Sequence, residues 1–357
     1  MFNRSNRLAP VIIILISSLG FLTSCNFVKT NTPTATLLKT EDASREELMN
    51  EVNRFASVNS VHAKMYLKFE DNSFAEFGNK EVYRAADGDV VVQRPSKIYM
   101  RVQVPVLKTD VAQMTSDGTS FRVAILQDGG SGRYKKFVKG TNDADYSKLQ
   151  KVMKSADLDN GKAIKENVNA FASLRPQHFT DAILVRPIDA GDVYAQSTIF
   201  QIEEDTSQQK KSPIRKVTRG YYLLDEFAKD SAGNLEITRR FWFDRVGGIR
   251  LARQQIFDIR GEVSSDIVYG KPGNLSDDLK YANLPLEITV TRPKEKYSMK
   301  LTYQTPESVT VGKLYPDTAF QLENSWPLPE VDLDKELREV TAGQPQNDNR
   351  NSASRAQ

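Results

Sequence analysis

Histidine and cysteine, which often supply acid–base or nucleophilic chemistry, are scarce in this chain. Its 357 residues include two histidines and one cysteine. His178 lies three residues before Asp181 on a predicted helix, a spacing at which a carboxylate could orient a catalytic base. A surface or helix-capping histidine is the simpler interpretation. His62 falls on the polar side of a predicted strand, where we expect it to be solvated.

No group of residues predicts a metal, cofactor or nucleotide site. A protein metal site normally needs three or four convergent His, Cys or carboxylate ligands. The glycine-rich run at residues 129–133 lacks the lysine and hydroxyl residue that end a phosphate-binding loop, and it lies between predicted strands. We therefore predict a protein that is not an enzyme and that needs no cofactor or metal ion.

The one cysteine, Cys25, directly follows a secretory signal. Two arginines precede an apolar run of 12 residues (11–22). That run is too short to cross a membrane, which takes roughly 17–25 helical residues. Residues 22–25 resemble the bacterial lipobox, in which the cysteine receives a diacylglyceryl group and becomes the N-terminus. We predict that residues 1–24 are removed and that acyl chains on Cys25 anchor the protein stably to a membrane.

The charge balance argues against a nucleic-acid partner. The chain has 49 Lys and Arg against 46 Asp and Glu, a formal net charge of +3. The signal carries two arginines and no acid, so the mature chain has 47 basic against 46 acidic residues, a net charge of +1. Because the sequence also shows no basic stripe, nucleic acid is not expected to bind.

The mature chain divides into a tether, one domain and a tail. Residues 25–40 are rich in Thr and Asn, which predicts a flexible, lipid-anchored tether. Ser44 and Glu47 form a capping box at the start of an amphipathic helix over 44–57. Residues 326–357 are rich in Pro, Asn, Gln and Asp and predict a disordered tail, with a short helix near 334–340.

Between tether and tail, residues 41–325 alternate apolar and polar side chains with period two, which predicts strands with one buried face. The strands are expected at 61–69 and 97–103, and in hairpins within 111–125, 235–258 and 286–303, with further helices around 164–171 and after Pro176. The predicted fold is α+β and mainly β: a strongly curved antiparallel sheet, or incomplete β-barrel, with helices covering its concave face.

The order of these parts resembles the Lol-type family, which comprises a periplasmic lipoprotein carrier and its outer-membrane receptor. Residues 94–107 with the hairpin after them, 174–184, 249–269 and 284–303 match the family pattern. Residues 127–162 and 188–234 depart from it as insertions. The resemblance implies a protein that faces the periplasm from the outer membrane, takes part in lipoprotein sorting, and binds acyl chains or lipoproteins. A periplasmic carrier or another envelope protein is the implied partner.

Two sets of residues are candidates for these roles. The hollow of the half-barrel is expected to be lined by alternating apolar residues of four strands: Met65, Leu67, Met100, Val102, Phe241, Phe243, Met299 and Leu301. The same residues could instead fill an ordinary core, which would leave a structural or interaction lipoprotein without a lipid ligand. Val106 and Leu107 lie in a loop with Pro105, and the resemblance implies that this loop contacts the membrane.

Overall fold

The computed structural model describes residues 34–71, 81–82, 86–127, 135–146, 149 and 176–342. The predicted signal peptide, Cys25, the helix expected at 164–171 and the end of the chain from residue 343 lie outside this part. The described residues belong to two compact units. Residues 34–38 and 202–218 form the hairpin unit, and the remainder forms the sheet unit. Within the described ranges, no helix combines the length and apolarity that spanning a membrane requires.

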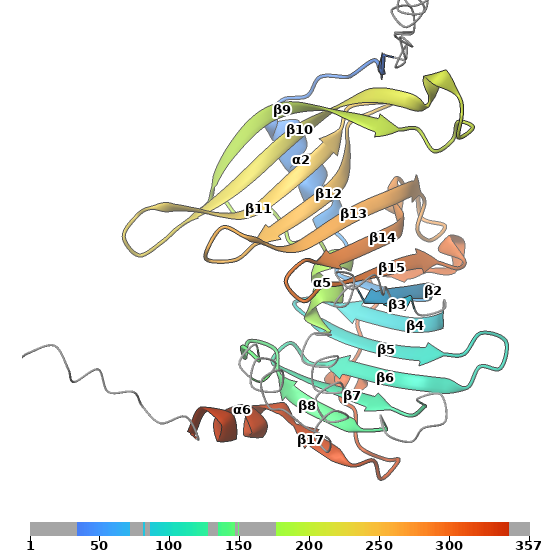
Figure 1. Ribbon diagram of the computed structural model, residues 1–357, viewed down its shortest axis with the longest axis vertical. Coiled ribbons are helices and arrows are strands. Elements are labelled where there is room, and N and C mark those ends of the chain that lie inside the picture. Colours follow the sequence, from blue (N-terminus) through green and yellow to red (C-terminus); the bar gives the residue numbers. More distant parts are fainter. Residues whose placement is uncertain are drawn as a thin grey trace, which may run out of the picture. The chain divides into compact units, whose positions relative to one another are not determined.

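The sheet unit is built on one large, curved and mainly antiparallel sheet (Figure 1). Its strands pair in the order β10–β11–β12–β13–β14–β15–β2–β4–β5–β6–β7–β8, and β17 adds to β8 in parallel. The strand β9 pairs with β10. Among the described residues no pairing joins β17 to β9, so the sheet stays open. This confirms the predicted incomplete barrel.

The bounds of the long strands are β2 (Ser60–Asp71), β4 (Ala86–Gln93), β5 (Lys97–Gln103), β6 (Asp110–Ser116), β7 (Ser120–Ile125), β8 (Phe137–Thr141), β9 (Val193–Glu204), β10 (Lys216–Lys229), β11 (Leu235–Asp244), β12 (Arg250–Phe257), β13 (Val263–Gly273), β14 (Leu284–Arg292) and β15 (Tyr297–Tyr303). The short strands are β1 (Thr36–Leu37), β3 (Glu81–Val82), β16 (Thr310–Val311) and β17 (Glu330–Asp332). The 3-10 turns are η2 (Pro213–Arg215), η3 (Leu279–Tyr281), η4 (Pro306–Ser308) and η5 (Asp317–Phe320).

The period-two pattern produces this sheet because one side of each strand is buried. In β15, burial alternates along the whole strand, with Met299 and Leu301 on the buried side. The register pairs Leu301 with Leu67 and Met299 with Phe69 of β2, so apolar residues of neighbouring strands lie on the same face. The strands expected at 61–69 and 97–103 and in the three hairpins are confirmed.

Two helices pack on the apolar face. The helix α2 (Arg45–Ala56) begins with the predicted capping box: the Ser44 backbone N–H donates to Glu47 Oε2 at 2.7 Å, and the Glu47 backbone N–H donates to Ser44 Oγ at 3.3 Å. Its residues Leu48 and Val52 are fully buried. The helix α5 (Gln177–Ile183) follows Pro176 and contacts β4, β5 and β14. Both helices confirm predictions.

The ends of the domain differ from expectation. Residues 330–342, assigned to a disordered tail, form β17 and the helix α6 (Leu333–Ala342), with Leu333 buried. Parallel pairing with β8 supplies the backbone hydrogen bonds that the tail was expected to lack. The tail therefore cannot begin at 326, although the short helix near 334–340 is confirmed. In the hairpin unit, β1 pairs with β10, which shortens the predicted tether.

Candidate functional site

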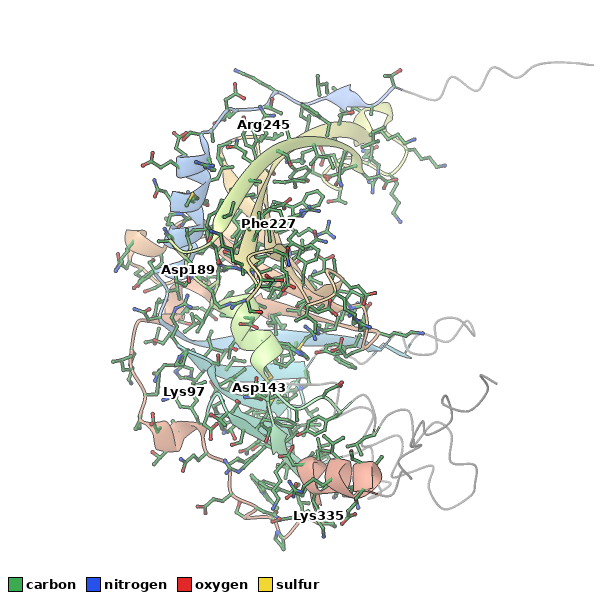
Figure 2. All side chains as sticks on the ribbon, turned by 90° about the vertical axis from the view of Figure 1, so that its left-hand side faces the viewer. Lys97, Asp143, Asp189, Phe227, Arg245 and Lys335 are labelled. Carbon is green, nitrogen blue, oxygen red and sulfur yellow. The ribbon has the colours of Figure 1, made fainter. Side chains whose placement is uncertain are left out.

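The eight residues proposed to line a hollow all lie on the inner, helix-covered face of the sheet unit. Seven of them are buried, and Val102 is half-buried against them. They belong to one continuous hydrophobic core, in which side chains of α5 and of the strands fill the space between helix and sheet (Figure 2). Their position on the inner face is as the alternation predicts, and their role in lipid binding stays a prediction.

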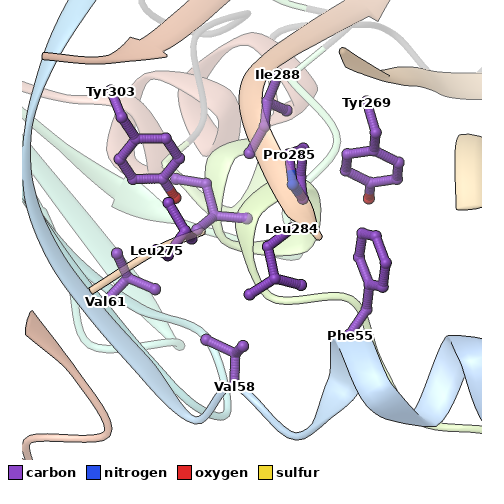
Figure 3. A pocket seen from close by; sticks show the side chains of 10 residues that line it. Phe55, Val58, Val61, Tyr269, Leu275, Leu284, Pro285, Ile288 and Tyr303 are labelled. Atoms are coloured by element: carbon purple, nitrogen blue, oxygen red, sulfur yellow. The ribbon is translucent and has the colours of Figure 1, made fainter. Parts of the chain in front are cut away.

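A small cavity lies between the C-terminal end of α2 and the start of β14 (Figure 3). Its lining includes Phe55, Val58, Tyr269, Leu284, Ile288 and Tyr303, and none of the eight predicted lining residues. The cavity volume is about 20 Å³, which is room for about one water molecule, whereas ligand pockets usually measure ~300–1,000 Å³. This cavity is therefore too small to hold an acyl chain.

Hydrogen bonds join α5 and the segment directly after it to the sheet. His178 Nδ1 lies 2.8 Å from the Tyr297 hydroxyl of β15. The Tyr269 hydroxyl donates to the Ala182 carbonyl at 3.2 Å, and Arg94 Nη2 donates to the Val185 carbonyl at 2.6 Å. His178 is buried, which corrects its interpretation as a surface or capping residue. It ties α5 to the sheet instead.

The chain after α5 is held by a buried ion pair. Arg239 donates through Nη1 and Nη2 to the carbonyls of Arg186 and Pro187, at 2.8 and 2.9 Å. The same guanidinium is paired with Glu226, whose carboxylate also accepts from the Tyr194 hydroxyl at 2.8 Å. Burial acts to raise the Glu226 pKa, but the hydrogen bonds and charge of Arg239 outweigh it, and the pKa is lowered.

Asp181 is an ionisable group on α5. Burial raises the pKa of this carboxyl, while the positive charges of Arg186, Arg292 and other arginines act in the opposite direction. The raised pKa of Asp181 and the lowered pKa of Glu226 show two carboxyls of one region in different electrostatic environments.

Sequence reasoning missed these polar contacts, although one signal was available. Arg239 occupies an inward-facing position of β11, in step with Phe241 and Phe243. Glu226 occupies the corresponding inner position of β10, beyond Leu224. A charged residue where the alternation calls for an apolar one must find a partner, because an unpaired buried charge is costly. The identity of that partner depends on the register, which the pattern alone does not give.

The loop between β5 and β6 presents an apolar tip. Val106 is 90% and Leu107 75% exposed. Backbone hydrogen bonds from Leu107 N–H to the Pro105 carbonyl, at 2.8 Å, and from Lys108 N–H to the Val104 carbonyl, at 3.0 Å, hold the turn. Val106 has a φ of 70°, a conformation that costs a β-branched residue on the order of 1–3 kcal/mol. The turn therefore holds the two side chains outward at a conformational cost.

The other histidine lies on the outer face. His62 Nε2 is 2.9 Å from Asp89 Oδ1, and Nδ1 is 3.1 Å from the Tyr315 hydroxyl. The side chain is half-buried by these neighbours rather than fully solvated as expected. In the described ranges, no three His, Cys, Asp or Glu side chains converge as metal ligands would.

The chain was compared with protein-family models, curated proteins and solved structures. No protein-family model matches the chain, and no curated protein does. A LolA superfamily protein from Nitrosomonas europaea aligns over 79% of this chain and 99% of its own, with 10% identity and a TM-score of 0.37. An outer membrane lipoprotein-sorting protein domain from Vibrio parahaemolyticus aligns over 77% and 95%, with 10% identity and a TM-score of 0.35. These low values carry no information on ligand or activity.

Proposed function

We propose that the protein is a lipid-anchored envelope protein of the Lol type, which binds acyl chains or lipoproteins on the inner face of its sheet. In this proposal Cys25 carries the anchor, the domain faces the periplasm from the outer membrane, and a periplasmic carrier or another envelope protein exchanges cargo with it. The observation that carries the proposal is the continuous apolar inner face covered by α5, a short helix whose His178 and Ala182 make hydrogen bonds to the sheet.

Binding would begin with movement of α5. Phe179 and Ala182 of α5 are fully buried, so displacing the helix uncovers apolar surface. An acyl chain that replaces the helix gains ~0.8 kcal/mol for each buried CH₂ group, as it does in a bilayer. The burial of the chain itself is then nearly balanced between bilayer and protein, and the cost of displacing α5 favours release, which suits transient carriage. The exposed pair Val106 and Leu107 would bring the domain against the membrane that supplies or accepts the lipid.

A second candidate is a structural or interaction lipoprotein whose inner face is permanently filled. The volume of the cavity, about 20 Å³, favours it. In this alternative α5 never leaves the sheet, the eight inner-face residues serve only stability, and the partner is another envelope protein.

The deciding experiment uses exported protein that lacks the anchor. We would purify the Cys25→Ala variant from the periplasm, extract it with organic solvent and analyse the extract by mass spectrometry. A fatty acyl ligand, or saturable uptake of a fluorescent fatty acid by the emptied protein, is expected for the first function. Protein that holds no lipid and takes up none supports the filled core.

Charged substitutions then locate the bound chain. Met100→Asp and Met299→Asp place a carboxylate on the inner face and should abolish uptake of the fatty-acid probe. Lys97→Glu is the matched control, because Lys97 lies on the outer face, with Nζ 2.6 Å from Asp317 Oδ1. Circular dichroism must show that each variant is folded. Equal uptake by folded forms of all three would place the ligand elsewhere.

A further inference from the structure

The hairpin unit places two exposed aliphatic side chains on one face of its strands, on either side of β10. β1 pairs with β10 in parallel and brings Leu37 opposite Thr218. The Asp205 N–H donates to the Arg215 carbonyl at 2.7 Å, and a Cβ on Gly220 would lie 3.0 Å from the Phe200 ring. Both contacts fit one antiparallel register of β9 and β10, and continuing this register puts Ile202 opposite Thr218. Residues directly opposite in neighbouring strands point to the same side of a sheet. Leu37 and Ile202 therefore flank Thr218 on one face.

Both aliphatic side chains are open to solvent. Leu37 is 66% and Ile202 68% exposed, and Ile214 at the end of the same hairpin is 55% exposed. Single exposed aliphatic residues are common on protein surfaces, whereas apolar side chains grouped on one face are typical of protein or membrane interaction sites. Charge contributes little here, because the described residues of the unit have four basic and three acidic side chains. One of these acids, Glu204, is paired with Arg215 at 3.0 Å.

The short distance in sequence between Cys25 and β1 favours the membrane as the partner of this face. Leu37 lies 12 residues after Cys25, and a chain of that length spans at most ~40 Å even when fully extended. If Cys25 carries lipid, as the proposed function holds, β1 stays within that distance of the bilayer at all times. A protein partner would have to compete with this permanently adjacent apolar phase.

We propose that Leu37 and Ile202 contact the membrane that holds Cys25, so that the hairpin unit rests in the lipid interface as a second, non-covalent attachment. The inference rests on the proposed anchoring at Cys25, and it concerns a different surface from the Val106–Leu107 loop. Because the unit is nearly neutral, its contact is expected to be the same with zwitterionic and with anionic phospholipids.

A fluorescent probe tests this contact in the full-length lipidated protein. Cys25 is the only cysteine, and lipidation consumes its thiol, so Ile202→Cys offers one site for a thiol-reactive NBD label. The protein is reconstituted into phosphatidylcholine vesicles, with and without nitroxide-labelled phospholipid. We expect a blue-shifted emission that loses most of its intensity to the nitroxide. Ile259→Cys, at a position 90% exposed in the turn after β12, is the matched control and should show neither change.

The unmodified chain separates the two possible failures. If the unmodified chain takes up no label, the thiol of Cys25 is blocked, as proposed. In that case, solvent-like emission from the label at position 202 overturns the membrane contact of the hairpin unit and leaves the proposed anchor standing. If the unmodified chain does take up label, the thiol of Cys25 is free, and this result contradicts both the proposed lipid anchor and the inference that rests on it. A blue shift that nitroxide lipid does not quench would show that protein covers this face, which also overturns the inference.

Discussion

The side chains of Arg239 and Glu226 form an ion pair that is almost entirely removed from solvent, with Arg239 Nε 2.6 Å from Glu226 Oε1 and side-chain exposures of 3% and 4%. The same guanidinium donates to the carbonyls of Arg186 and Pro187. A single arginine therefore connects β10 and β11 with the segment that follows α5. Two carbonyls of that segment lose their donors if the arginine is removed.

Replacing this arginine should strongly destabilise the domain. Arg239→Met leaves Glu226 buried without its cation, and breaking a buried pair in this way costs ~3–5 kcal/mol. Arg240→Met is the matched control, because Arg240 pairs with Asp225 in a half-exposed bidentate contact and exposed pairs contribute ~1 kcal/mol or less. Urea unfolding measures both values, and similar losses would contradict the assignment.

The ion pair also predicts acid sensitivity. Because the Glu226 pKa is lowered in the folded protein, its ionised form stabilises the fold at every pH above the ordinary glutamate value, about 4.3. This contribution is lost as the pH falls from that value through the lowered pKa. In Glu226→Gln, the free energy of unfolding should depend less on pH below about 4.3. A pH dependence as steep as in the unmodified protein would argue against the prediction.

Asp181 predicts the opposite sign. Burial raises its pKa, so the protonated form favours the folded state, and this stability is lost as the pH rises from the ordinary aspartate value through the raised pKa. Asp181→Asn, which cannot ionise, should therefore have a higher Tm than the unmodified protein at pH 7 and little difference at pH 3. Scanning calorimetry at both values checks this, and a lower Tm at pH 7 would show that the nearby arginines need the charge.

The proposed movement of α5 makes a kinetic prediction. Tyr297→Phe removes the hydroxyl that faces His178 and should cost about 1 kcal/mol of stability. If α5 must leave the sheet for lipid to enter, this variant takes up a fatty-acid probe faster in stopped-flow measurements. Tyr303→Phe is the control, since Tyr303 is buried on the same face of β15. Equal rates for both variants would mean that entry does not require the His178–Tyr297 contact to break.

The loop between β5 and β6 can be tested without disturbing the core. Leu107→Glu should change the free energy of unfolding by ~0.5 kcal/mol or less, because the side chain is exposed, while abolishing insertion of the loop into lipid vesicles. Ile259→Glu, on another exposed turn, is the control and should leave insertion unchanged. A large loss of stability in Leu107→Glu would show that Leu107 packs on the domain.

Local patterns were sufficient to predict much of the fold. The alternation along 61–69 identified β2, and the Ser44–Glu47 box identified the start of α2, because each signal depends on residues close in sequence. The buried contact of His178 with Tyr297 and the pairing of β17 with β8 were missed, because each joins residues more than a hundred positions apart. The free volume on the inner face could not be predicted from the sequence either, because it depends on how side chains from many strands pack together.

The position of β2 between β4 and β15 also decides when the sheet can form. Residues 65–71 of β2 pair with Tyr297–Tyr303 of β15. An early strand can therefore complete its hydrogen bonding only after nearly the whole domain has been synthesised. Pairing between such distant segments slows folding. During synthesis from the N-terminus, β2 and its neighbours through β8 are made first, and the edge of β2 that pairs with β15 is then still open. An unpaired strand edge can associate with other chains, so a chaperone would be most useful before β15 has been synthesised.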